Sequence, residues 1–377
     1  MRLSPVLAGL APYPFAALRE TRERLEAAGV EVLDMGVGEP REETPAFIRE
    51  AVGGAVRPTS PYPVTGGLPE LRSAIAAWVG RRFGVALDPA TEIIPTLGTK
   101  EVIFGMASVV GGDLVAVPSP GYPVPDRGAR FAGKAVLELP LLASNGFLPD
   151  LDAIPAAAWA RVGLLWLNYP NNPTAAVAPL ALFERAAELA REHDFLVCSD
   201  EAYSEIYFGA EPPRSILEVA DRTNVLALNT LSKRSAMPGY RSGFAAGDPA
   251  AIAALGKFRP NTGTVPLELV QRVSVVAWED EAHVEGMRKI YRAKRDVLLP
   301  ACEAAGLHHV GGDATMFLWL ADPEDRCSEL RERGVLLAPG DFFGPEGKGY
   351  ARLALVQPLE VCQKAAEAIS RLRGGRR

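Results

Sequence analysis

Seven short apolar runs in the middle of the chain, separated by longer amphipathic segments, limit the possible fold most narrowly. The runs are residues 93–96, 114–117, 135–139, 163–167, 195–198, 225–228 and 243–246. Strands that are apolar at nearly every position are typical of a parallel sheet covered on both faces. The longer segments between them predict crossover helices. We therefore expect an α/β protein with a mostly parallel sheet.

The helical pattern is clearest in three segments, residues 99–110, 180–193 and about 280–305. The third has apolar residues at helical spacing among Arg and Glu, which predicts a solvated helix with one packed face. A Pro/Gly/Thr stretch at 259–266 ends the α/β pattern, and two isolated strand-like runs follow at 316–320 and 350–356. We expect a large α/β domain over 41–258 and a smaller α+β domain from 1–40 and 259–377.

Composition excludes several classes of protein. The 377 residues carry 40 Lys plus Arg against 46 Asp plus Glu, a net charge of −6, so we expect no nucleic-acid partner. No apolar run long enough for a membrane span exists. Four scattered cysteines predict reduced thiols and a cytoplasmic location. Four histidines form no zinc-ligand pattern, so we expect no metal. Pro12 and Pro14 interrupt the apolar stretch 6–18, which predicts a surface arm rather than a signal peptide.

Polar residues follow three of the expected strands at the point where each strand ends. In open parallel sheets, ligands bind beyond the carboxyl ends of the strands, so these side chains are expected in one pocket. They are Asn172 after 163–167, Asp200 and Tyr203 after 195–198, and Lys233 after 225–228. This combination suits a pyridine-ring cofactor such as pyridoxal phosphate, because a lysine forms the Schiff base and an acid pairs with the ring nitrogen.

A phosphate group needs its own cradle. The backbone N–H groups at Gly98, Thr99 and Lys100, where a helix is expected to begin, favour an anion. The guanidinium of Arg241 and the hydroxyls of Thr230 and Ser232 would complete the site by charge-assisted hydrogen bonds.

Several motifs in this order and spacing resemble the class I/II, fold-type I aminotransferases. They are Asn172-Pro-Thr174, Ser199-Asp-Glu-Ala-Tyr203, and Ser232-Lys-Arg234 with Arg241 eight residues after Lys233. The similarity continues through 36–40, 62–72 and 350–353, and so covers nearly the whole chain. The resemblance implies a large domain with a doubly wound, mostly parallel sheet, a smaller α+β domain and pyridoxal 5'-phosphate as cofactor.

The resemblance also implies a role for each residue that matches a family motif. Lys233 would carry the cofactor and move a proton at the substrate α-carbon, and Asp200 would hold the ring nitrogen. Asn172 and Tyr203 would contact the phenolic oxygen, Tyr122 would stack on the ring, and Arg352, with Gly38 and Asn172, would bind the substrate α-carboxylate. Tyr62 would reach the phosphate of a neighbouring subunit, which implies a homodimer with shared sites.

Some positions depart from the family pattern or allow another interpretation. Ala175 stands where the family usually has Gly, and Leu97 where many members carry a hydroxyl. Asp200 could instead cap a helix starting near Glu201, and Arg234 is either a second anion contact or a helix cap. Tyr62 and Tyr122 could instead be aromatic residues that pack on a loop. Lys100 could be a solvated lysine in the first turn of a helix. Whether Asp313 faces the ligand stays open.

The expected reaction is transfer of an amino group between an L-amino acid, with glutamate the first choice, and a 2-oxo acid. Segments 231–244, 263–266 and 280–284, with Tyr291 and Arg295, most resemble the N-succinyl-diaminopimelate aminotransferases of lysine biosynthesis. A distal substrate carboxylate would then need a cation, with Arg19, Arg127, Arg130 and Arg259 as candidates. The competing activities are those of an aspartate or aromatic aminotransferase, a carbon–sulfur β-lyase, and a non-catalytic ligand-binding relative.

Overall fold

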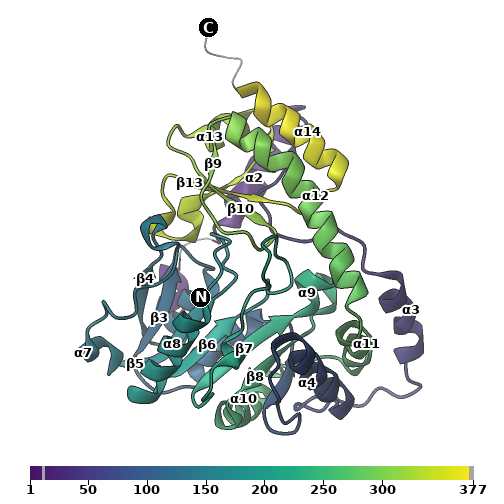
Figure 1. The fold of residues 1–377 in the computed structure, drawn as a ribbon, viewed down its shortest axis with the longest axis vertical. Coiled ribbons are helices and arrows are strands. Elements are labelled where there is room, and N and C mark those ends of the chain that lie inside the picture. The colour runs from purple at the N-terminus through teal and green to yellow at the C-terminus, as the bar shows by residue number, and fades with distance from the viewer. Residues whose placement is uncertain (11–12, 373–377) are drawn as a thin grey trace.

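The computed structural model describes residues 1–10 and 13–372, and its lower part in Figure 1 is built around a seven-stranded sheet. Its strand order is β2 (Ile93–Thr96), β8 (Gly243–Gly247), β7 (Val225–Thr230), β6 (Leu196–Asp200), β5 (Val162–Asn168), β3 (Leu114–Ser119) and β4 (Ala135–Pro140). Strand β8 runs antiparallel to both of its neighbours and the remaining pairs are parallel. All seven predicted strands are confirmed, with ends that agree to within two residues.

The two faces of this sheet bury separate cores, which explains why its strands are apolar at successive positions. In β5, Leu164 and Trp166 belong to one core, and Leu165 and Leu167 belong to the other. The core that contains Leu165 is covered by α4 (Pro69–Phe83), α8 (Leu180–Glu192) and α11 (Glu268–Glu279). The core that contains Leu164 is covered by α5 (Lys100–Gly105), α6 (Val124–Phe131) and α10 (Pro249–Thr262). The sheet is therefore covered by helices on both faces.

A second, four-stranded antiparallel sheet lies beyond the carboxyl ends of the first. Its order is β12 (Ala338–Pro339), β13 (Tyr350–Ala354), β10 (Phe317–Ala321) and β9 (His308–His309). Helix α12 (Ala282–Ala304) runs from beside α9 (Leu231–Arg234) and α11 up to α14 (Leu359–Ser370) (Figure 1). The N-terminal segment joins this part of the molecule, because β1 (Leu33–Asp34) pairs in parallel with β11 (Val335–Leu336).

The remaining helices are α1 (Pro5–Gly9), α2 (Phe15–Ala27), α3 (Ala46–Ala55), α7 (Ala156–Trp159) and α13 (Arg326–Glu332). The strand-like runs 316–320 and 350–356 are confirmed as β10 and β13, while the division into domains at residues 41 and 258 stays a prediction. Within residues 1–10 and 13–372, no helix combines the length and apolar character needed to cross a membrane.

The structure corrects two expected helix boundaries. The helix predicted over 99–110 is shorter, since α5 ends at Gly105 and a 3₁₀ turn follows. The stretch 259–266 does not break the pattern at its start, because α10 continues through Pro260 to Thr262. Buried Arg259 anchors that last turn through Glu101 at 3.0 Å and the carbonyl oxygen of Pro95 at 2.9 Å. Tertiary contacts therefore outweigh the local proline signal.

Candidate active site

A pocket of about 320 Å³ opens at the carboxyl ends of β5, β6 and β7, where the polar strand ends were expected to meet. Of the fourteen predicted site residues, those lining it are Gly38, Thr99, Lys100, Tyr122, Asn172, Asp200, Tyr203, Thr230, Ser232, Lys233, Arg241 and Arg352. Gly98 lies just behind the wall, and Tyr62 lies elsewhere on the surface. Residues far apart in the chain thus form one pocket.

Lys233 extends from the one-turn helix α9 into this pocket, where its Nζ donates a hydrogen bond to the carbonyl oxygen of Gly38 at 3.1 Å. Burial lowers the pKa of Lys233 to about 8, and the positive charges of Arg352 and Arg241 act in the same direction. Glu39 and Asp200 partly offset this effect on the pKa. Near neutral pH, a larger fraction of this amine is uncharged than for an exposed lysine, which suits a nucleophile.

Asp200 ends strand β6 and is 8% exposed. Burial raises its pKa to about 7, although the Ala202 N–H and the Thr99 hydroxyl donate to the carboxylate and lower it. The oxygen Oδ1 has no hydrogen-bond partner within the described residues. The helix-cap interpretation is wrong, because residues 202–205 form a turn and no helix starts at Glu201. A buried carboxylate with a free oxygen is instead suited to a protonated ring nitrogen.

Arg352 lies on β13, lines the same pocket and is 2% exposed. Its Nη1 donates to Asn172 Oδ1 at 2.7 Å and its Nη2 to the Gly36 carbonyl oxygen at 2.8 Å. The Phe317 ring lies 4.1 Å from the guanidinium carbon. No carboxylate in the described part of the chain forms an ion pair with it, and Nε has no partner there. Burial lowers the pKa of Arg352 to about 10. A buried arginine without an acid indicates a site for an anionic ligand group.

Two tyrosines form further parts of the wall. Tyr203 packs its ring edge against Phe317 with ring centroids 5.5 Å apart, and burial raises the pKa of its hydroxyl. Burial also raises the pKa of Tyr122, and its hydroxyl is hydrogen-bonded to Tyr13. Both phenols therefore stay protonated over the physiological pH range and are available as hydrogen-bond donors.

The predicted phosphate cradle is assembled on the side of β7 and α5. Arg241 is held by hydrogen bonds from its Nη2 to the Leu97 carbonyl oxygen at 2.7 Å and from its Nη1 to that of Pro238 at 2.9 Å. Gly98 has φ +72°, a conformation that favours glycine, and a Cβ there would lie 2.8 Å from Arg241 Nη2 and displace the guanidinium. Thr230 Oγ1 and Ser232 Oγ are 2.9 Å apart beside it.

The sequence interpretation missed several residues of the wall. They are Tyr13, Phe15, Val37, Glu39, Asn168, Ala202, Pro238 and Phe317. Tyr13 and Phe15 belong to the N-terminal arm, which therefore contributes to the pocket and is more than a surface arm. Glu39 lies within the 36–40 motif that the family resemblance already included. The Lys100 side chain lines the pocket while staying exposed, and its partial burial lowers its pKa, so it is a solvated lysine at the edge of the site.

Several predicted arginine roles are wrong. Arg234 does not line the pocket, so it is no second anion contact there, and its buried side chain pairs with Glu281 at 2.8 Å. Its Nη2 also donates to the carbonyl oxygen of Asp280 at 3.5 Å, the residue that caps the end of α11, as the helix-cap interpretation expects. Arg259 is unavailable to substrate because it pairs with Glu101. Arg130 and Arg19 lie outside the pocket lining, each in an ion pair with an acid on its own helix.

Three further open positions have an outcome. The Arg127 guanidinium carbon lies 5.0 Å from the ring centroid of Tyr13, a residue of the pocket wall. Arg127 therefore stays a candidate for binding the distal carboxylate of the substrate. Asp313 pairs with Arg295 and does not line the pocket. Ala175 has φ +60°, so the turn adopts the left-handed conformation that glycine favours, at the energetic cost of a Cβ there.

Comparison with known proteins shows the family. Residues 30–369 match the family model described as "Aminotransferase class I and II". The chain belongs to the class I and II aminotransferases. It is 41% identical over 377 residues to an LL-diaminopimelate aminotransferase of Aquifex aeolicus, covering 97% of each chain. It is 40% identical to the protein of the same name from Nitratidesulfovibrio vulgaris strain DP4, covering 98% of this chain and 99% of the relative.

Among solved structures, a "probable N-succinyldiaminopimelate aminotransferase" of Thermus thermophilus superposes with a TM-score of 0.88. It is 32% identical, and the match covers 95% of this chain and 99% of the other. The fold is thus that of the fold-type I aminotransferases, as expected from the sequence.

Aminotransferases of this class depend on pyridoxal phosphate, and the pocket fits that group. The free Oδ1 of Asp200, the amine of Lys233 and the glycine at position 98 beside Arg241 are the features that a ring nitrogen, an aldehyde and a phosphate require. The chain is therefore a pyridoxal-phosphate-dependent aminotransferase.

Proposed function

We propose that Lys233 binds the cofactor aldehyde and moves the proton between the substrate α-carbon and the cofactor. Bound pyridoxal phosphate supplies the electron sink that makes removal of this proton feasible. Asp200 holds the ring nitrogen, Tyr122 packs on the ring, and Asn172 and Tyr203 hydrogen-bond its phenolic oxygen. Gly98, Thr99 and Lys100 present backbone N–H groups to the phosphate, together with Thr230, Ser232 and Arg241. Arg352 binds the substrate α-carboxylate beside Gly38. The lowered pKa of Lys233 is the observation that supports the first role.

For the substrate, we infer LL-diaminopimelate or its 2-oxo counterpart, which places the reaction in lysine biosynthesis. The observation that carries this choice is Glu39, which lines the pocket, interacts with the charge of Lys233 and forms no ion pair with another described residue. LL-Diaminopimelate has an ammonium and a carboxylate at its far end. Glu39 suits that ammonium, and Lys100 suits the carboxylate. The curated relatives at 40–41% identity carry this substrate in their names.

A second candidate is the N-succinylated substrate, which lacks the distal ammonium and has an additional carboxylate. Two cations near Tyr13 favour it: Lys100 Nζ lies 5.5 Å and the Arg127 guanidinium carbon 5.0 Å from the centroid of its ring. The Thermus thermophilus structure supports the same candidate by name. The two substrates therefore differ in their need for Glu39.

The absorbance of the cofactor-loaded enzyme distinguishes these substrates. We expect LL-diaminopimelate and glutamate to bleach the visible cofactor band, and a 2-oxo acid to restore it. With the N-succinyl compound we expect the band to disappear more slowly. Glu39→Gln is expected to lower kcat/KM for LL-diaminopimelate about 10-fold, because a charge-assisted contact is lost. For glutamate, which has no distal ammonium, the effect is expected to stay within about 3-fold.

Glu43→Gln is the matched control, since Glu43 is exposed, pairs with Arg49 at 3.4 Å and does not line the pocket. If Glu39→Gln lowers kcat/KM equally for LL-diaminopimelate and for glutamate, Glu39 does not bind the distal ammonium. Turnover of the N-succinyl compound alone would select the second candidate. Pyruvate and ammonia from cystathionine-like donors would indicate the β-lyase, and turnover of aspartate or aromatic donors alone would indicate an aspartate or aromatic aminotransferase. An unchanging band with every donor would indicate the non-catalytic relative.

We also propose a cytoplasmic homodimer in which Tyr62 contacts the cofactor phosphate of the partner subunit. The Tyr62 side chain is fully exposed, and Val56 and Leu267 near it are 62% and 61% exposed. We expect the Tyr62→Ala homodimer and the Lys233→Ala homodimer each to have little amino-transfer activity. Hybrid dimers of the two variants would have one intact site, so an exchanged equimolar mixture is expected to recover about a quarter of wild-type activity. Absence of recovery, with exchange verified by mass, would contradict the shared site.

A further inference from the structure

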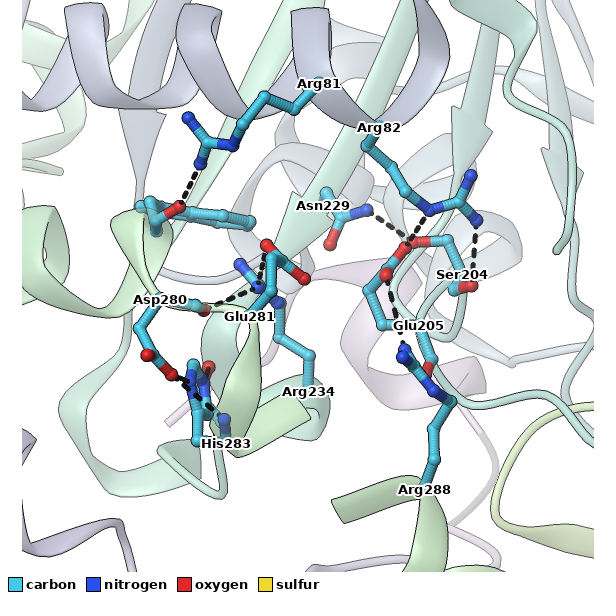
Figure 2. Close-up of polar contacts among 12 residues, drawn as sticks. Arg81, Arg82, Ser204, Glu205, Asn229, Arg234, Asp280, Glu281, His283 and Arg288 are labelled. Atoms are coloured by element: carbon cyan, nitrogen blue, oxygen red, sulfur yellow. Dashed lines mark hydrogen bonds and ion pairs between the residues drawn. The ribbon is translucent and has the colours of Figure 1, made fainter. Parts of the chain in front are cut away.

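Helix α9, which carries Lys233, is only one turn long, and its last residue is anchored in an unusual way. The Arg234 side chain is 1% exposed, and its guanidinium carbon lies 4.7 Å from the ring centroid of Trp278 and 5.2 Å from that of Trp78. Its Nη2 donates to Glu281 Oε1 at 2.8 Å, while Nε and Nη1 have no hydrogen-bond partner within the described residues (Figure 2). Burying a cation in this way is costly and needs its one acidic partner.

The next residue is held by a second chain of hydrogen bonds. Ser235 is fully buried, and its Oγ lies 2.8 Å from His283 Nε2. His283 Nδ1 lies 2.6 Å from Asp280 Oδ1, and the His283 backbone N–H donates to the same oxygen at 2.9 Å (Figure 2). Phe47 packs against the edge of this imidazole, with ring centroids 5.5 Å apart. The tautomer with Nδ1–H toward Asp280 leaves Nε2 as the acceptor for the serine hydroxyl.

Both chains start from the same short segment, residues 280–283 at the beginning of α12. The same helix also supports the Tyr203 side of the pocket, because Glu205 pairs with Arg288 at 3.8 Å and with Arg82 of α4 at 2.9 Å (Figure 2). The start of α12 thus contacts two of the chain segments that line the pocket, the one with Tyr203 and the one with Lys233.

We propose that Arg234 and Ser235, held by Asp280, Glu281 and His283, position α9 so that the Lys233 amine stays enclosed in the pocket. The inference rests on the proposed role of Lys233 as the cofactor-bearing residue. None of the five is itself a residue of the pocket lining, so they act through Lys233 and are positioning residues.

The physical consequence is a change in the proton affinity of the Lys233 nitrogen. Burial is the main cause of its lowered pKa, and Arg352, Arg241, Glu39 and Asp200 act on it through space. A displacement of about 1 Å at separations near 5 Å changes a Coulomb interaction enough to move a pKa by roughly 0.4 unit. A loosened α9 admits water, so the pH midpoint of the cofactor-linked nitrogen is expected to rise.

The test is a pH titration of the visible cofactor band in the holoenzyme without substrate. Ser235→Ala and Glu281→Ala are each expected to raise the midpoint by about 0.3–0.5 pH unit and to lower kcat about 3–10-fold, with KM changed less than about 2-fold. Glu281→Gln keeps a hydrogen-bond acceptor for Arg234, so its midpoint is expected to rise by no more than half as much as that of Glu281→Ala. Asp313→Asn is the control, because it removes a different ion pair of α12, that with Arg295.

Midpoints equal to wild type in both alanine variants would overturn the proposal, even if their melting temperatures fall, since a merely structural role changes only stability. If Glu281→Ala fails to fold, Ser235→Ala, which deletes one oxygen atom, still decides the question. Lys233→Ala in the same titration separates the two inferences, because a titrating band that persists there would refute the role of Lys233 itself.

Discussion

Lys233→Ala is expected to lower kcat for amino transfer at least about 10³-fold and to remove the cofactor band that depends on a lysine link. The alanine loses both the nucleophile and the base, and Lys100, the other lysine in the pocket lining, has an exposed side chain instead of a buried amine. Pyridoxal phosphate itself is expected to remain bound through Arg241 and its neighbours. Single-turnover absorbance with L-glutamate measures the loss directly.

Lys257→Ala is the control for this experiment, because Lys257 is exposed on α10 and lies outside the pocket. Circular dichroism of both variants checks that the fold is retained. More than about a tenth of wild-type turnover in Lys233→Ala would refute the assignment.

Arg352→Lys is expected to lower kcat/KM for every amino donor by about 10²–10³-fold, mainly through KM. Arginine offers five N–H groups in a plane. Asn172 and Gly36 occupy two of them, so the remainder are available for a bidentate carboxylate. Lysine has three donors at a single nitrogen and cannot keep both protein contacts and a bidentate ligand. Steady-state kinetics with two donors measures the change.

Arg371→Lys is the matched control, since Arg371 is 77% exposed and pairs only weakly, at 3.7 Å, with Glu367. A KM for the amino donors that stays within about 2-fold of wild type in Arg352→Lys would contradict binding of the α-carboxylate by this residue.

Local sequence determined the central sheet and most of the pocket. The seven strands are recognisable because both faces of the sheet are buried, so successive residues such as Leu164 and Leu165 must both be apolar. Parallel strands bring their carboxyl ends to one edge, so Asp200 and Lys233 had to lie close together once the strands were known. The strand ends, the expected anion cradle and the family motifs together named twelve residues that the pocket does contain.

Only the tertiary structure decided which cations are free. Arg234 and Arg259 stand in sequence like anion-binding residues, yet Glu281 and Glu101, which lie far from them in the chain, neutralise both in the interior. Arg352 has the opposite environment, with aromatic rings around it and no ion pair to an acid within residues 1–10 and 13–372. The tertiary structure also decided that the N-terminal arm places Tyr13 in the pocket wall. Local pattern encodes burial and backbone preference, whereas the partner of a buried charge depends on packing between distant segments, and this decides whether that charge is left for a ligand.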